Sequence, residues 1–173
     1  MSQKDEVFLI DSNSLISPYQ LYYPFDFASR FWDQLKEKIE DGNVIILDVI
    51  KDELMKGNDE LSKWINQFDH NLILDRRTSE ILGNYGKVLN YIQASGLYKE
   101  KALTEWSNVN VADPWLIAVA LTFGHTIITF EKHNGGIKAM SQLGSAKIPD
   151  VCRAFDIECR DLFYMMRALS FQM

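Results

Sequence analysis

The chain has 173 residues, of which 47% are hydrophobic and 24% charged, and it carries a formal net charge of −6. A chain of this length is expected to fold as a single domain, residues 1–173, that buries about 70% of its unfolded surface, enough for a core without disulfide bonds. The longest uncharged apolar run, WLIAVALTF at 115–123, is too short to cross a bilayer, and MSQKDEVFLI at the start lacks the features of a signal peptide. A membrane partner is therefore not expected.

The charge is unevenly distributed along the chain. Residues 132–173 contain 6 Lys and Arg residues against 4 Asp and Glu residues, so the acidic excess lies in the rest of the chain. An acidic chain is a poor general binder of nucleic acid, but this slightly basic end is compatible with a local contact. Cys152 and Cys159 do not have a metal-binding spacing, which favours a reducing, cytoplasmic location.

Short apolar runs and helical periodicity predict strands alternating with helices. In chain order, the expected elements are a strand at 7–10 (VFLI), a helix at 27–39, a strand at 44–47 (VIIL), helices at 48–56, from Asp59 to Phe68, at 81–92, at 98–106 and at 113–123, a strand at 125–130 (HTIITF), a helical turn at 149–155, a strand at 156–159 and a helix from Asp161. Asp48 and Asp113 are expected to be N-caps, the second because Pro114 follows it. Strands that are apolar throughout and alternate with helices predict an α/β sandwich with a mainly parallel sheet.

Four acidic residues stand at or near the expected carboxyl ends of strands. Asp11 follows the first strand directly, and Glu131 follows the strand at 125–130. Because ligands of parallel α/β sheets bind beyond the carboxyl ends of the strands, these two acids should share one rim. Glu53, in the helix after the second strand, and Asp113, at the start of a later helix, are able to reach that rim, although the sequence does not require it.

Carboxylates gathered at one site raise one another's pKa unless a cation compensates their charge. An oxygen-only ligand set suits Mg²⁺ or Mn²⁺, and such an ion supports phosphodiester cleavage by holding phosphate oxygens and activating water. Asn13, two residues after Asp11, is placed to orient a ligand water or a phosphate. The ordinary structural interpretations are an Asx turn for Asp11, exposed helix charge for Glu53, an N-cap for Asp113 and a loop charge for Glu131. Only the four acids taken together point to a functional site.

Four segments occur in an order and spacing typical of one family. They are VFLIDSNSLI, DVIKDELMKG, VADPWLIAVAL and TIITFEKH. Together they resemble the PIN-domain nucleases, including the ribonuclease toxins of prokaryotic toxin–antitoxin pairs. The family pattern is Asp-x-Asn after the first strand, an acid in the second helix, an Asp opening a later helix, and Thr-x-Asp after the next strand. It is matched by Asp11 with Asn13, by Glu53, by Asp113, and by Thr129 with Glu131.

The resemblance covers nearly the whole chain and implies a PIN-like three-layer sandwich, with a central, mainly parallel sheet of about five strands flanked by helices. It implies RNA as the substrate and Mg²⁺ or Mn²⁺ as the cofactor. The implied catalytic and metal-holding residues are Asp11, Glu53, Asp113 and Glu131. The candidate substrate-binding residues are Asn13, Thr129 and Lys132. An antitoxin protein partner and a homodimer are also compatible with this family.

The chain departs from the family pattern in three places. Glu131 replaces the commoner Asp, and Asp150, near the same strand ends, is an alternative or additional acid. A helical insert is expected around residues 70–106, and the polar stretch from Lys132 to Lys147 is extended.

Three functions are open from the sequence. The first is a metal-dependent ribonuclease. A phosphatase with Asp11 as nucleophile ranks well below it, because Asn13 stands where such an enzyme needs an acid to protonate the leaving group. The third is a non-catalytic PIN-like module that binds RNA or a protein. Stabilisation by Mn²⁺ distinguishes it from the first, since only a metal pocket predicts such an effect.

Overall fold

Five short parallel strands form the central sheet, in the order β3-β2-β1-β4-β5. The strands are β1 (Phe8–Ile10), β2 (Val44–Leu47), β3 (Ile73–Leu74), β4 (Thr126–Ile128) and β5 (Cys159–Arg160). The structure is a computed structural model that describes residues 6–134 and 141–173, so residues 1–5 and part of the stretch at 132–147 lie outside the described residues. The predicted α/β fold with a parallel sheet of five strands is confirmed.

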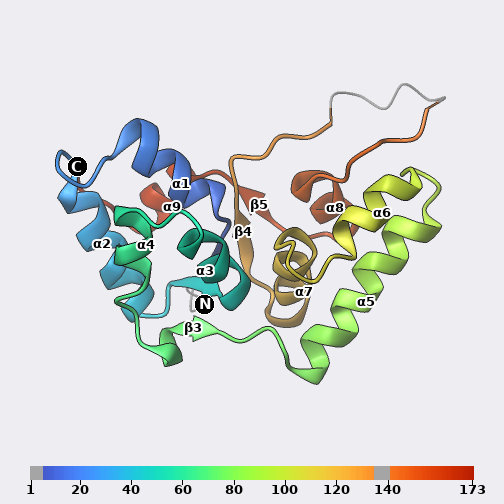
Figure 1. Cartoon of the computed structure of the whole chain (residues 1–173), viewed down its shortest axis with the longest axis horizontal. Helices are drawn as coiled ribbons and strands as arrows, with labels where there is room; N and C mark the ends of the chain where they lie inside the picture. Colours follow the sequence, from blue (N-terminus) through green and yellow to red (C-terminus); the bar gives the residue numbers. More distant parts are fainter. Residues whose placement is uncertain (1–5, 135–140) are drawn as a thin grey trace, which may run out of the picture.

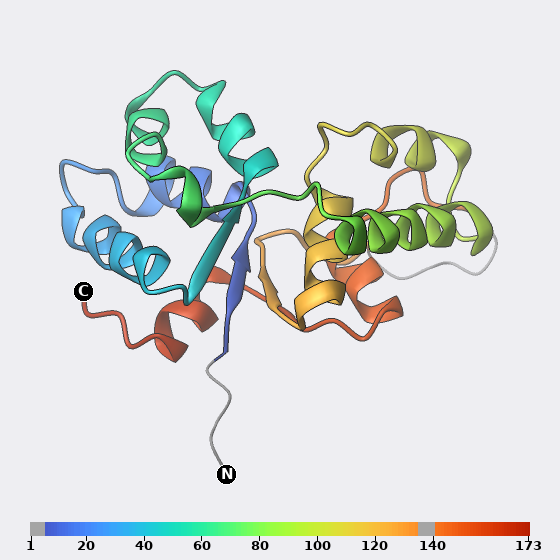
Figure 2. The ribbon, with the colours of Figure 1, turned by 90° about the horizontal axis from the view of Figure 1, so that it is seen from below.

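Helices cover both faces of this sheet. They are α1 (Asn13–Ser17), the π-helical turn η1 (Pro18–Tyr22), α2 (Ser29–Glu40), α3 (Asp48–Met55), α4 (Glu60–Ile65), the 3-10 turn η2 (His70–Leu72), α5 (Ser79–Ala94), α6 (Glu100–Trp106), α7 (Asp113–Phe123), α8 (Ile148–Ala154) and α9 (Leu162–Ala168). Figures 1 and 2 show α2 and α4 on one side of the sheet and α5 to α8 on the other, which gives three layers. Among the described residues, no helix is both long and apolar enough to span a membrane.

The register of the two central strands fixes where their loops begin. Ile10 of β1 pairs with Ile128 of β4, and the Asp11 N–H donates to the Ile128 carbonyl oxygen at 2.9 Å. All residues of both strands are buried, as their apolar composition requires. The predicted strand at 125–130 therefore ends at Ile128, and Asp11 and Thr129 leave the sheet at the same level.

Aromatic side chains tie the helices together within each outer layer. Trp32 of α2 stacks on Phe25 with ring centroids 4.4 Å apart and meets Trp64 of α4 edge-on at 5.0 Å. In the opposite layer, Tyr85 of α5 stacks on Trp115 of α7 at 3.7 Å. The three tryptophans are at most 7% exposed. The second stack holds the beginning of α7, where Asp113 lies.

Two strands differ from the sequence-based expectation. β3 was not among the expected strands, because it has only two half-buried residues at the edge of the sheet. It lies within residues 70–106, so part of this stretch belongs to the sheet. β5 begins at Cys159, and Asp156, expected to be in this strand, adopts a left-handed backbone conformation with φ of 55°. An L-residue in that conformation fits a turn and not a strand.

The two predicted N-caps were wrong. Asp48 and Asp113 are the first residues of α3 and α7, and the cap positions are occupied by Leu47 and Ala112. Proline at the second helical position of α7 is equally compatible with this start, because its missing N–H lies in the first turn. Among the described residues, none donates a hydrogen bond to the Asp113 carboxyl group. Its carboxyl group is therefore not used to start the helix.

Candidate active site

Asp11 is held at the carboxyl end of β1 by hydrogen bonds to both of its carboxylate oxygens. The Ser12 backbone N–H donates to Oδ1 at 2.8 Å, and the Thr129 hydroxyl donates to Oδ2 at 2.8 Å. Only 5% of the residue is exposed. The carboxylate therefore has a fixed orientation at the rim of the sheet.

Asn13 and Thr129 join the loops that follow β1 and β4. Asn13 Oδ1 accepts a hydrogen bond from the Phe130 N–H at 3.0 Å, and Asn13 Nδ2 donates to Thr129 Oγ1 at 3.2 Å. Thr129 Oγ1 also accepts from the Glu131 N–H at 3.0 Å. These two predicted substrate-binding residues thus direct their polar atoms to other parts of the chain, and the contacts position Asp11 and Glu131.

Replacing Thr129 with valine is expected to lower the free energy of unfolding by about 1–3 kcal/mol, because it leaves buried groups of Asp11 and Glu131 without their partner. Valine keeps the shape of threonine, so the loss reports the hydroxyl. Urea unfolding of both proteins measures the difference. Thr104→Val, at an exposed position of α6, is the matched control and is expected to change stability by less than about 0.5 kcal/mol. A Thr129→Val protein as stable as its parent would show that this hydroxyl does not hold the rim together.

Both carboxylate oxygens of Glu131 are already in use. Lys147 Nζ donates to Oε1 at 3.1 Å, and the Ile148 N–H donates to Oε2 at 2.6 Å. Ile148 is the first residue of α8, whose early N–H groups have no partner within the helix. Glu131 therefore anchors the start of α8. Sequence reasoning missed this pairing, because Glu131 and Lys147 are 16 positions apart and the stretch between them follows no periodic pattern that would bring the two side chains together.

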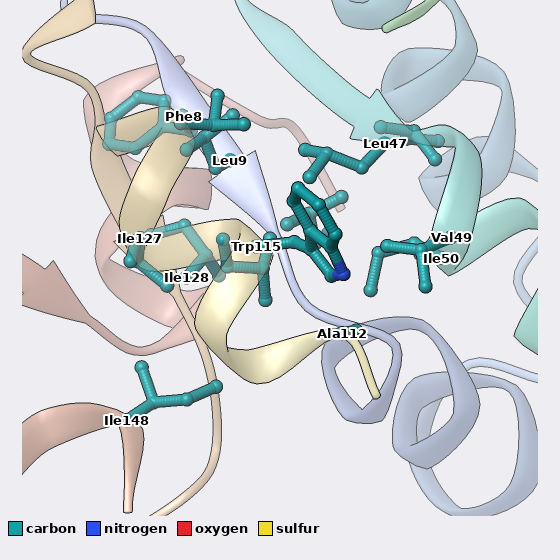
Figure 3. Packing of buried hydrophobic residues seen from close by; sticks show 14 of the residues in the cluster. Phe8, Leu9, Leu47, Val49, Ile50, Ala112, Trp115, Ile127, Ile128 and Ile148 are labelled. Carbon is teal, nitrogen blue, oxygen red and sulfur yellow. The ribbon is translucent and has the colours of Figure 1, made fainter. Parts of the chain in front are cut away.

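Asp113 of α7 and Glu53 of α3 are the two further acids of the set, and the charge of Glu53 acts on the Asp113 carboxyl group. Figure 3 shows the Trp115 side chain of α7 between β1 and the α3 residues Val49 and Ile50. Asp113 precedes Trp115 by two residues, and Glu53 follows Ile50 by about one helical turn. Trp115 is only 3% exposed, so its packing fixes the start of α7, where Asp113 lies.

The four predicted acids lie within electrostatic reach of one another. Burial raises the pKa of Asp113 to about 8, and the negative charges of Asp11, Glu131 and Glu53 add to this increase. Burial likewise raises the pKa of Asp11 to about 6, although its two hydrogen bonds oppose the change, and the charges of Glu131 and Glu53 contribute. Without a cation, the Asp113 carboxyl group therefore stays largely protonated at pH 7, whereas Asp11 loses its proton only as the pH rises through about 6.

A divalent cation fits this donor set, although the ligands are not yet gathered around one point. Within residues 6–134 and 141–173, no three His, Cys, Asp or Glu side chains are arranged as a metal-ion site. The charges of Asp11, Glu131 and Glu53 raise the pKa of Asp113, and Lys147 pairs with Glu131. The donors are all oxygen atoms, and the Asp113 carboxylate accepts no hydrogen bond from a described residue. Asp11 and Asp113 are thus the residues best placed to hold an ion such as Mg²⁺ or Mn²⁺, with Glu53 beside them.

Asp150, the alternative fourth acid, takes part in a different cluster. Its Oδ1 lies 2.8 Å from His133 Nδ1, and its Oδ2 accepts from the Asn134 N–H at 2.9 Å. Asp150 is therefore engaged with the loop after Glu131, which leaves Glu131 as the acid nearer to the cluster. Lys132 is exposed and, among the described residues, makes no ion pair or hydrogen bond.

The chain matches one protein family over residues 8–173, described as "Domain of unknown function (DUF4411)". No curated protein matches it. Its fold is similar to a structure of VapBC2 from Rickettsia felis bound to a DNA fragment from their promoter, with a TM-score of 0.53, 14% identity, and coverage of 90% of this chain and 98% of that chain. VapBC-1 from nontypeable Haemophilus influenzae aligns with a TM-score of 0.49, 17% identity, and coverage of 90% and 97%. At this identity, similarity to the Rickettsia protein concerns the fold alone. The chain has a PIN-like fold and belongs to the DUF4411 family.

Proposed function

We propose that the chain is a ribonuclease that uses Mg²⁺ or Mn²⁺ to hydrolyse RNA phosphodiester bonds. The proposed metal-holding residues are Asp11, Glu53, Asp113 and Glu131. The observation that carries the proposal is that two buried carboxyl groups have raised pKa values in the field of two further acids. Such an arrangement opposes folding, and strongly perturbed acids gathered at one edge of a sheet are typical of functional sites.

The bound ion would supply the activation of water and the neutralisation of phosphate charge. Asp11 and Asp113 would hold it as carboxylates, and at pH 7 Asp113, whose pKa is about 8, would have to give up its proton to do so. The Thr129 hydroxyl keeps one oxygen of Asp11 in a constant direction, and Asn13 keeps the two loops at a constant separation. Lys132, exposed in the loop next to Glu131, would bind a phosphate of the RNA strand.

Cleavage of an end-labelled single-stranded RNA tests the proposal. Cleavage is expected with Mg²⁺ or Mn²⁺ and is expected to stop when EDTA removes the ion, because the acids alone repel the phosphate. Attack by water leaves no 2′,3′-cyclic phosphate, whereas a contaminating ribonuclease that uses the 2′-hydroxyl without metal does leave one. Cleavage that persists in EDTA, or no cleavage with either ion, would contradict the proposal.

We also infer that the chain acts in the cytoplasm as the toxin of a toxin–antitoxin pair, as a homodimer with an antitoxin protein as partner. The order of the PIN-type motifs supports this setting, and the free thiols of Cys152 and Cys159 agree with a reducing compartment. Co-expression with the product of the neighbouring gene tests the partner. The expected result is a stable complex in which RNA cleavage is suppressed. A neighbouring product that neither binds the chain nor affects cleavage would contradict the inference.

One observation favours a second candidate, a non-catalytic module that binds RNA or a protein. Lys147 and the Ile148 N–H occupy both oxygens of Glu131, so the acidic cluster has an internal counter-charge without any metal. In that case the cluster would not bind Mn²⁺, and the melting temperature would not respond to the ion.

A further inference from the structure

A cavity of about 480 Å³ lies directly beside the acidic cluster, between the loop after β4 and the start of α9. The lining residues that matter for its chemistry are Thr129, Phe130, Glu131, Lys132, Arg160 and Asp161. Its volume falls in the range of sites for small organic ligands. Because Thr129 and Glu131 line it, a molecule in the cavity would contact the same loop that positions Asp11.

The cavity has an aromatic wall whose position is held from behind. Phe130 packs against Tyr22 and Phe163, with ring centroids 6.3 and 5.9 Å away. Its backbone N–H is fixed by Asn13. The ring is therefore held among other rings, yet it remains partly exposed and lines the cavity. Such a held aromatic surface is suited to stacking with the flat face of a nucleobase.

Two basic side chains line the cavity together with Phe130. Lys132 is exposed and, in the part of the chain that the structure describes, makes no ion pair. The Arg160 side chain is 48% exposed. It pairs with Glu158, and its guanidinium group lies over the Tyr164 ring. Glu131 and Asp161 also line the cavity. Glu131 is paired with Lys147, and Asp161 Oδ1 accepts from the Tyr164 N–H at 2.8 Å at the start of α9. Lys132 in particular is available to a phosphate.

We propose that this cavity is a subsite for one nucleotide of a single-stranded RNA, with the base against Phe130 and its phosphate facing Lys132 and Arg160. The proposal rests on the proposed ribonuclease function for what happens to the strand, but the binding itself does not require cleavage. Bases in a duplex are stacked and their faces are covered, so an aromatic wall inside a cavity selects an unpaired base. The subsite would thereby restrict the substrate to loops and single strands, and would place the neighbouring phosphodiester near Glu131.

Fluorescence anisotropy of a labelled RNA hexanucleotide in EDTA tests the subsite without any cleavage. Phe130→Leu is expected to weaken binding about 5-fold or more, because loss of a base–aromatic stack has at least that effect. The same variant should bind a hexamer of abasic ribose phosphates as the parent does. Lys132→Ala should weaken both strands and reduce the slope of log affinity against log salt by about 0.7.

Two variants outside the cavity serve as matched controls. Phe123→Leu removes a ring that is 45% exposed at the end of α7, and Lys87→Ala removes an exposed charge on α5. Neither is expected to change RNA affinity. Melting curves show whether Phe130→Leu remains folded, and Lys132→Ala, at an exposed position, provides an independent readout if it does not.

The outcomes separate the subsite from the ribonuclease function. If Phe130→Leu and Lys132→Ala bind RNA as tightly as their controls, the subsite is overturned, even if the parent cleaves RNA. If Phe130→Leu weakens RNA and abasic strands equally, the base does not stack there and the subsite is again overturned. If both variants behave as expected but the parent never cleaves RNA, the subsite stands and the ribonuclease function fails.

Discussion

Asp113→Asn is expected to abolish metal-dependent RNA cleavage while raising the free energy of unfolding of the metal-free chain. The pKa of Asp113 is raised from 3.8 to about 8 in the folded state. At pH 7 the folded chain therefore keeps this proton, whereas the unfolded chain releases it. That difference reduces stability, and asparagine removes it because it has no charge to bury. One pKa unit corresponds to about 1.4 kcal/mol, and we expect a gain of at least about 1 kcal/mol at pH 7. Urea unfolding and a cleavage assay on the same preparation measure the two effects.

Asp11→Asn is expected to abolish cleavage without this gain in stability. Both oxygens of Asp11 accept hydrogen bonds, from the Ser12 N–H and from the Thr129 hydroxyl. An asparagine side chain has only one oxygen, so it leaves one of these donors facing an NH₂ group, which offsets the removal of the charge. Asp52→Asn, an exposed neighbour of Glu53 on α3, is the matched control and should keep both activity and stability. An Asp113→Asn protein that cleaves RNA at the parental rate would remove Asp113 from the proposed site.

Mn²⁺ is expected to raise the melting temperature of the parent, and the increase should be larger at pH 8 than at pH 5.5. The raised pKa values of about 6 for Asp11 and about 8 for Asp113 mean that both carboxyls hold protons at pH 5.5. Metal must displace these protons, so binding is weaker in acid. Above pH 4 the unfolded carboxylates are ionised, so the contribution of these groups to metal-free stability falls as the pH rises, up to about 6 for Asp11 and up to about 8 for Asp113. Binding of the ion is expected to restore the stability that the metal-free chain loses over that pH range.

The size of this stabilisation follows from mass action. At an ion concentration 100 times the dissociation constant, the gain is about 2.7 kcal/mol, or roughly 5–10 °C in a chain of this length. Differential scanning fluorimetry at both pH values measures it. The control Asp52→Asn should respond as the parent does, whereas Asp113→Asn should not respond. No shift at millimolar Mn²⁺ in the parent at pH 8 would favour the non-catalytic binding module.

The sequence by itself determined the kind of fold and the order of the acids. VFLI and VIIL are apolar at every position and are short, which is the pattern of strands buried on both faces, so the parallel sheet followed from local composition. The strand ends then placed Asp11 and Glu131 at one rim, since all parallel strands end at the same edge. β3 was not predicted, because a two-residue edge strand buries too few residues to produce a recognisable apolar pattern in the sequence.

Only the tertiary structure decided how these acids are used. An Asp before proline has the local pattern of an N-cap. Nothing within the segment shows that Asp113 is instead the first residue of α7, with a carboxyl group that accepts no hydrogen bond from the residues that the structure describes. The pairing of Glu131 with Lys147 and the cavity beside Phe130 depend on residues far apart in the chain. Periodicity reports which face of an element is apolar, because burial acts on each residue locally. It does not report which distant side chains meet, because the packing of whole helices and strands sets those distances.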